Sequence, residues 1–169
     1  MSDSQLSHPL STRPVTRDDE RFLRQVYKSS RGDDLRGLGW EEDRISKFLE
    51  MQYEAQRKFF ESDYQNASDE VVLLDSKPAG RLIVERREHE IRFIDLGLLP
   101  AYRNQGVGTS IVRQLQEEAL ASNKSLRLQV IRFSRAVNLL ERLGFVRTSE
   151  TGTHFQMEWT AEALRKKSL

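Results

Sequence analysis

The stretch that decides the fold of this 169-residue chain is "AYRNQGVGTSIVRQL", Ala101–Leu115. An apolar run ends at Pro100 just before it, and Gly106 and Gly108 then lead into a helical pattern. Glycine permits close approach of the backbone, and the free amides and dipole of a helix N-terminus favour an anion. The stretch therefore predicts a strand, a phosphate-binding loop and a helix, in that order.

Composition narrows the possible functions. The chain has 27 Lys and Arg against 26 Asp and Glu, so its charge gives no general attraction to nucleic acid or to an anionic membrane. The absence of cysteine excludes disulfides, thiolate metal sites and a cysteine nucleophile. No apolar run is long enough to span a bilayer, and the first dozen residues lack the apolar core of a signal peptide. We therefore expect a cytoplasmic protein with no nucleic-acid or membrane partner.

The first 66 residues have mainly helical patterns. Residues 1–11 are expected to be a disordered leader, and Thr16 is a plausible N-cap for a first helix. Residues 31–39 predict a loop because they hold three glycines and paired aspartates. A second helix is expected over about 41–62, with an apolar stripe of Ile45, Phe48, Leu49, Phe59 and Phe60. Gln52 and Gln56 fall inside this stripe, so they either bond to nearby backbone or line a cavity.

From Asp69 onward the pattern changes to strands. Residues 71–74 and 80–85 predict a hairpin around "DSKP", and 91–99 predict a central strand because both of its faces are apolar. After the opening stretch, residues 126–131 predict a strand and "SRAVNLLERLG" a short helix, with Ser134 as N-cap and Gly144 just beyond its end. Two strands joined through Thr151 and Gly152 follow, and residues 161–169 are expected to be a polar tail. This order indicates an α/β protein with a mixed sheet.

Three interpretations of the phosphate loop compete. A Walker loop needs a Lys after its last glycine, and Thr109 follows here instead. A dinucleotide fingerprint needs a third glycine, but position 111 is Ile, and the acidic residue expected about 20 positions later is missing. The third interpretation is the pyrophosphate loop of an acyl-CoA transferase.

At this point the chain resembles the GNAT superfamily of N-acetyltransferases, which use acetyl-CoA. "RNQGVG" is similar to the family's Arg/Gln-x-x-Gly-x-Gly/Ala loop, and the apolar strand that ends in "LLP" precedes it. "RAVNLLERLGF" resembles the family's second signature, and "RPVTRDDERFL" its first strand and helix. The resemblance covers about Thr12–Thr160. It implies one GNAT-like domain, α/β (α+β), with a mixed, centrally splayed sheet of about six to seven strands and helices on both faces.

The resemblance also implies how acetyl-CoA would bind. The strand end would hold the pantetheine arm through Leu96, Gly97 and Leu98, with Gly97 at a bulge beside the splay. Backbone groups of Leu96 and Leu98 would polarise the thioester carbonyl. The loop would bind the pyrophosphate through Arg103, Asn104, Gln105, Gly106, Val107, Gly108 and Thr109.

Two positions depart from the family pattern. Where the family has a Tyr that protonates the departing thiolate, this chain has Leu140. Where the family often has an Asn that touches the pantetheine, it has Phe133, which we place in the cofactor site. A thiol with a pKa of about 8.5 is already a tolerable leaving group, so the loss of one acid costs about 10²-fold in rate.

Asp95 is the candidate general base, because a carboxylate inside an apolar strand has a raised pKa. The alternative is a structural carboxylate bonded to a bulge amide or an arginine. The family resemblance also leaves open an ordered water as the proton acceptor, in which case no single base is required. Gln52, Gln56 and His154 are candidates for the acceptor site, although a surface position would also explain His154. The three histidines are scattered, so no metal site is expected.

The expected function is direct transfer of an acetyl group from acetyl-CoA to a primary amine of a small molecule or peptide. The alternative is a CoA-binding module without chemistry, a sensor or partner subunit, and a nucleotide-binding protein is a more distant third. The family resemblance also suggests a homodimer.

Overall fold

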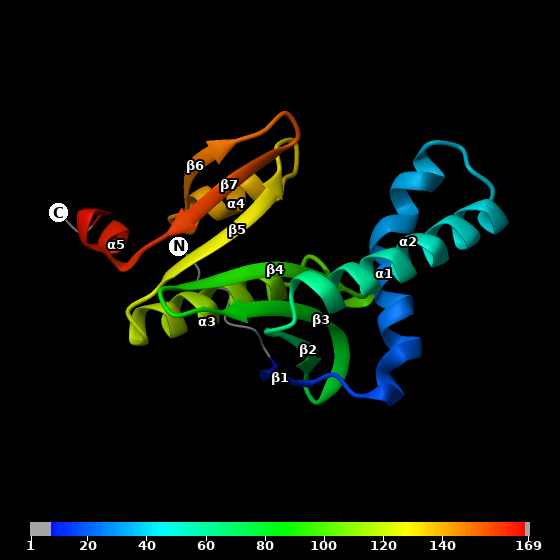
Figure 1. Ribbon diagram of the computed structural model, residues 1–169, viewed down its shortest axis with the longest axis horizontal. Helices are drawn as coiled ribbons and strands as arrows, with labels where there is room; N and C mark the ends of the chain where they lie inside the picture. Colours follow the sequence, from blue (N-terminus) through cyan, green and yellow to red (C-terminus); the bar gives the residue numbers. More distant parts are fainter. Residues whose placement is uncertain (1–7, 168–169) are drawn as a thin grey trace. The chain divides into compact units, whose positions relative to one another are not determined.

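The computed structural model describes residues 8–167, apart from the side chains of Asp34 and Lys167. Seven strands are hydrogen-bonded in the order β1-β2-β3-β4-β5-β7-β6 (Figure 1). The β4/β5 ladder is parallel, whereas the β1/β2, β5/β7 and β6/β7 ladders are antiparallel. The prediction of a mixed α/β fold with about six to seven strands is therefore confirmed. The chain forms two compact units, and strands β3 and β4 belong partly to each.

The first unit comprises the described residues up to Ile83 together with Asp95–Gly108. Its elements are β1 (Leu10–Pro14), a 3-10 turn (Arg17–Asp19), α1 (Glu20–Gly37), α2 (Glu42–Asp63), β2 (Ala67–Leu74), most of β3 (Lys77–Arg86), the second half of β4 (Glu90–Leu98) and a 3-10 turn (Pro100–Tyr102). Strand β1 begins inside the segment expected as a leader, whose first seven residues lie outside the described part. Asp75 and Ser76, with φ of 53° and 62°, make the predicted hairpin turn between β2 and β3.

The entry into α1 is fixed by Asp19. Its carboxylate accepts hydrogen bonds from the Thr16 amide (2.8 Å) and hydroxyl (3.2 Å). Thr16 is thus the N-cap of the 3-10 turn, whereas the N-cap of α1, predicted at Thr16, is Asp19. Both terminal nitrogens of Arg13 also donate to it, each at 2.8 Å. The Arg13 hydrogen bonds and the Thr16 amide hold the pKa of Asp19 well below its ordinary value. The carboxylate therefore ties β1 to the start of the helix.

The loop predicted for residues 31–39 is wrong, because α1 continues to Gly37. Arg36 forms ion pairs with Asp33 (2.8 Å) and Glu42 (2.6 Å), which give these polar residues partners along the helix and at the start of α2. Leu35 and Trp40 also pack against the core between the two helices. These contacts outweigh the low helix propensity of the glycines and aspartates. The chain turns only at Gly39, where φ is 79°.

Helices α1 and α2 pack on each other through a core that the sequence located only in part. The buried members are Leu23, Tyr27, Ile45, Leu49 and Tyr53. The predicted stripe on α2 was wrong in two places, because Phe59 is 50% exposed and Gln52 is also exposed. The buried positions instead follow i, i+4 spacing from Ile45 through Tyr53.

A network of ion pairs borders this helix contact on its exposed side. Arg24 on α1 pairs with Glu20 (3.1 Å), Glu50 and Glu54 (2.5 Å). Lys28, also on α1, pairs with Glu50 at 3.1 Å. The side chains of these five residues are between 27% and 42% exposed. The network therefore joins α1 to α2 across a surface that water reaches.

Two glycines allow the closest backbone approaches in the first unit. A Cβ at Gly80 on β3 would lie 2.2 Å from the carbonyl oxygen of Gly97 on β4. A Cβ at Gly97 would lie 2.8 Å from Cγ1 of Val26 on α1. Gly97 was expected to serve a bulge, but its lack of a side chain is explained here by the close approach of α1. Both β3 and α1 can therefore lie tightly against β4.

The second unit comprises Val84–Ile94 and the described residues from Thr109 onward. Its further elements are α3 (Val107–Ala121), β5 (Ser125–Ile131), α4 (Ala136–Arg142), β6 (Val146–Glu150), β7 (His154–Trp159) and α5 (Ala161–Lys167). One side of α3 is buried at residues that follow i, i+4 spacing, namely Val107, Ile111, Leu115 and Ala119. Residues 161–167, expected as a polar tail, are helical.

Most of the predicted details of this unit are present. The parallel ladder pairs Glu90–Phe93 of β4 with Ser125–Leu128 of β5, and the register extends no further along β4. The Ser134 hydroxyl accepts a hydrogen bond from the Ala136 amide (3.1 Å) at the start of α4. Gly144 has φ of 96°, as expected just beyond that helix. The boundaries of these strands and helices therefore lie close to the predicted positions.

Replacement of Gly80 by Ala should lower the free energy of unfolding by about 3 kcal/mol, because the new methyl would overlap the Gly97 carbonyl. Urea unfolding followed by circular dichroism measures the change. Gly152→Ala is the matched control: a Cβ there has no neighbour within 4 Å, so its effect should stay within about 0.5 kcal/mol. Equal effects of the two substitutions would contradict the packing described for β3 and β4.

Candidate functional site

The loop between β4 and α3 has the backbone of an anion-binding turn. Asn104 and Gly106 both have positive φ, 58° and 83°, on either side of Gln105. Alternation of left-handed residues with ordinary ones turns successive amides toward one side, and α3 begins directly after Gly106. The first amides of a helix have no partner within the helix. The loop and helix start therefore supply backbone donors that suit a diphosphate.

The side chains of the loop brace it against the end of β4. Arg103 Nε donates to the Leu98 carbonyl at 3.0 Å, and its guanidinium lies 3.8 Å from Asp33. The Gln105 amide group donates to the Ala101 carbonyl at 2.6 Å. A Cβ at Gly106 would meet no atom within 4 Å, so this glycine is needed for its positive φ and not for space. Arg103 was predicted to assist an anion, and the structure places it on the strand end beside the loop.

Asp95 lies two residues before Gly97 on β4 and faces α1 and α2. It lines a small cavity of about 10 Å³, roughly the room that one water molecule needs. The polar groups around it are Tyr27, Ser30 and Arg31 of α1, Gln56 of α2 and Arg81 of β3. The structure thus brings together two residues predicted from sequence, Asp95 and Gln56, at one cavity in the first unit.

The surroundings of Asp95 act on its charge in opposite directions. Burial raises the pKa of this carboxyl above its ordinary value. The positive charges of Arg31 and Arg81, and a hydrogen bond from the Leu96 amide, act against that rise, whereas Asp69 adds to it. A carboxylate with a raised pKa is a stronger proton acceptor than one in water, which is what a general base requires.

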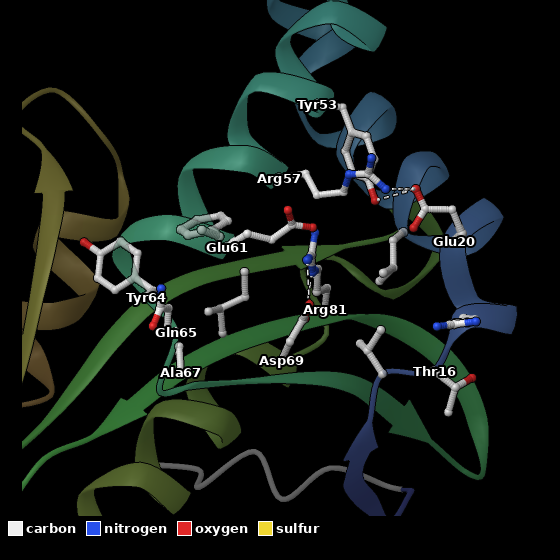
Figure 2. Close-up of a pocket in the computed structure, with 15 residues that line it drawn as sticks. Thr16, Glu20, Tyr53, Arg57, Glu61, Tyr64, Gln65, Ala67, Asp69 and Arg81 are labelled. Carbon is white, nitrogen blue, oxygen red and sulfur yellow. Dashed lines mark hydrogen bonds and ion pairs between the residues drawn. The ribbon is translucent and has the colours of Figure 1, made fainter.

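A second, larger cavity of about 710 Å³ shares Leu23 and Arg81 with the small one (Figure 2). Its rim carries Glu20, which accepts from the Tyr53 hydroxyl at 3.4 Å and lies 3.8 Å from Arg57. Its volume falls in the range of small-molecule sites. The remaining walls are Val15, Thr16, Arg17, Phe60, Glu61, Tyr64, Gln65, Ala67, Asp69 and Ile83.

Comparison with known proteins finds a family that part of the chain resembles. Residues 67–147 match the family described as "Acetyltransferase (GNAT) domain". This match includes β4, the loop and α3, the elements that carry the candidate site. This region, just under half of the chain, is therefore similar to a GNAT acetyltransferase domain.

A curated acetyltransferase is also similar to part of the chain. Over 74 residues the chain is 35% identical to mouse thialysine N-epsilon-acetyltransferase, a match that covers 43% of this chain and 44% of the relative. The chain thus spans less than half the length of that curated relative.

Two solved structures share the GNAT fold over most of the chain. The first is PaiA N-acetyltransferase from Thermoplasma acidophilum in complex with coenzyme A, which has a TM-score of 0.68 and 18% identity and covers 90% of this chain and 99% of that one. The second is a spermidine N-acetyltransferase chimera from Vibrio cholerae, which has a TM-score of 0.62 and 17% identity and covers 92% and 98%. At these identities the likeness shows the fold alone.

The two departures from the GNAT pattern have different surroundings in the second unit. Leu140 on α4 is 6% exposed, so its side chain belongs to the core of that unit. Phe133, between β5 and α4, is 90% exposed. The structure supplies no donor hydroxyl at position 140, and the predicted role of Phe133 in holding CoA stays a prediction.

The other two residues predicted for the acceptor site, Gln52 and His154, do not line the Asp95 cavity. Gln52 is exposed on α2, and it is Gln56, one turn later, that reaches the cavity. His154 begins β7 in the second unit, where its Nδ1 lies 2.7 Å from the Thr153 hydroxyl. Their roles in binding an acceptor remain predictions.

Sequence reasoning missed the Asp69–Arg81 pair. Arg81 Nε and NH2 donate to the two Asp69 oxygens at 2.8 and 2.7 Å, and the Arg81 side chain is only 14% exposed. The available signal was an arginine inside the apolar strand "GRLIVE", preceded by an aspartate at the start of "DEVVLL". A charge in such a strand needs a partner of opposite sign.

Within residues 8–167 no three or more His, Asp or Glu side chains gather as a metal site would require. In the same part of the chain no helix is long and apolar enough to cross a membrane. The absence of a metal cofactor therefore stays a prediction.

Proposed function

We propose that this chain transfers an acetyl group from acetyl-CoA to a primary amine, by direct attack of the amine on the thioester. The observation that carries the proposal is the GNAT domain at residues 67–147, whose loop has the backbone of a diphosphate site. A GNAT-fold structure that contains coenzyme A supports the choice of co-substrate. The names of the mouse and Vibrio relatives as N-acetyltransferases support nitrogen as the acceptor atom.

The chain's own residues supply three functions in this reaction. Amides from Gln105 to Thr109 bind the pyrophosphate, and the helix dipole of α3 adds to their effect. Backbone groups at Leu96–Leu98 hold the pantetheine arm as a neighbouring strand would, and they polarise the thioester carbonyl. Asp95 takes the proton that the ammonium group must lose before its nitrogen can attack.

The size of the Asp95 cavity restricts how the proton can reach Asp95. A space of about 10 Å³ has no room for the amine itself, so the proton passes from the ammonium to Asp95 through one water. The neutral nitrogen then attacks the thioester carbonyl, loses its second proton to solvent as the amide bond forms and the carbon–sulfur bond breaks, and the departing thiolate takes a proton from solvent. Leu140 offers no acid at this position, so the proton comes from solvent. Solvent suffices because a thiol with a pKa of about 8.5 is a tolerable leaving group.

The acceptor is proposed only as a class, a small molecule or peptide with a primary amine. Gln56 is the acceptor-site candidate that lies beside Asp95, and it offers both a donor and an acceptor for an ordered water. The earlier expectations of a homodimer and of a cytoplasmic location remain part of the proposal.

Gly106→Ala should weaken acetyl-CoA binding by about tenfold, because an L side chain at φ of 83° costs about 1–2 kcal/mol and reorients the loop amides. Titration calorimetry measures the dissociation constant. Gly39→Ala serves as the control, since it also has a positive φ and open space but lies outside the loop. Equal weakening in both variants would mean that the loop is not the site.

Asp95→Asn should lower kcat by about 10²-fold or more while leaving the dissociation constant of acetyl-CoA unchanged, because it removes the proton acceptor and no cofactor contact. Release of free CoA against a panel of primary amines measures the rate. Glu88→Gln, with a side chain 88% exposed, is the control and should keep the wild-type rate. Wild-type protein that binds acetyl-CoA and never releases CoA with any amine would overturn the proposal.

A CoA-binding module without chemistry is the second candidate, and the burial of Leu140 where the family has a Tyr favours it. A matched pair of substitutions separates the two functions. Under the proposed function Leu140→Tyr should turn over faster than Leu140→Phe, by up to about 10²-fold, because the two differ only by the hydroxyl. No turnover in wild type or in either variant, with acetyl-CoA binding retained, would favour the module.

A further inference from the structure

Arg81 lies close to two carboxylates of the first unit, Asp69 and Asp95. On one side it holds Asp69 through two parallel hydrogen bonds of 2.8 and 2.7 Å, the fork geometry that fixes a guanidinium most firmly (Figure 2). On the other side it lines the small cavity that contains Asp95. Its side chain is 14% exposed, so water screens its charge only weakly.

Every side-chain hydrogen bond and ion pair that Arg81 shows within residues 8–167 goes to Asp69. Asp95 therefore feels the positive charge of Arg81 without receiving a hydrogen bond from it. A direct Arg81–Asp95 pair would hold the Asp95 carboxylate charged and make it a poor proton acceptor. With no cation nearby, burial would instead raise the pKa of this carboxyl further.

The groups that face Asp95 come from each element around the cavity. Helix α1 contributes Arg31 and Tyr27, and α2 contributes the neutral Gln56. Strand β3 contributes Arg81, and β2 contributes the charge of Asp69 behind it. Burial raises the pKa of Asp95, the two arginines lower it, and Asp69 raises it again.

We propose that the Asp69–Arg81 ion pair is a positioning unit that holds a positive charge beside Asp95 while it keeps the guanidinium from pairing with that carboxylate. Its meaning for catalysis rests on the proposed function, in which Asp95 accepts a proton in every turnover. Arg81 and Asp69 act through Asp95 and touch neither co-substrate nor acceptor in this scheme.

Two substitutions should move Asp95 in opposite directions. Arg81→Gln removes the nearby cation, so the titration of Asp95 should move to higher pH. Asp69→Asn removes a like charge and frees the guanidinium to approach Asp95, so the titration should move to lower pH. Each displacement should reach about half a pH unit or more, given the effect of one charge at short range.

The titration is measured by carbon NMR of the full chain with labelled aspartate carboxyl groups, and the Asp95 signal is assigned by its loss in Asp95→Asn. Arg147→Gln is the control, because it removes an arginine that pairs with Glu141 in the second unit. It should leave the Asp95 titration in place. If Arg81→Gln fails to fold, Asp69→Asn alone tests the inference, because it should move the titration of Asp95 to lower pH.

A second measurement connects the titration to catalysis. The acidic limb of the pH profile of kcat/KM should follow the same opposite displacements, which a general loss of stability would not produce. Displacements in the same direction, or none in either variant, would overturn the inference. If the wild type shows no turnover, the proposed function fails, and the NMR titration still decides the role of the ion pair.

Discussion

The absence of side chains where β3, β4 and α1 meet is the constraint on which the first unit depends. A Cβ at Gly80 would overlap a β4 carbonyl, and one at Gly97 would overlap Val26 of α1. Because α1 can lie this close to β4, the space left around Asp95 shrinks to about the size of one water. The burial that raises the pKa of Asp95 is therefore a consequence of two missing methyl groups nearby.

Local patterns predicted the second half of the chain well. The helix after "RNQGVG", the caps at Ser134 and Gly144 and the last two strands depend on neighbours in sequence, and the structure places them as expected. The loop was also recognisable, because glycine spacing and a preceding strand are local features. What sequence could not supply was the positive φ of Asn104, a residue that adopts this conformation more readily than most but does not require it.

The errors in the first half came from tertiary contacts. Residues 31–37 look like a loop by propensity, yet ion pairs of Arg36 and packing of Leu35 keep them helical. The stripe on α2 was misplaced because the apolar side chains of Phe59 and Phe60 extended it toward the end of the helix, whereas the buried residue is Tyr53. The Asp69–Arg81 pair was missed for a related reason: its residues lie on two different strands, β2 and β3, and only the pairing of these strands brings them together.

The ion pairs of the first unit also differ in how ionic strength would act on them. The pairs that join α1 to α2 through Arg24 and Lys28 lie where water and dissolved ions reach them, so salt screens their attraction. In the Asp69–Arg81 pair the arginine side chain is only 14% exposed whereas Asp69 is 36% exposed, so dissolved ions reach this pair from the aspartate side. Rising salt therefore weakens the ion pairs between the two helices more than it weakens the positive charge that Arg81 presents to Asp95, because that guanidinium is the mostly buried member of its pair.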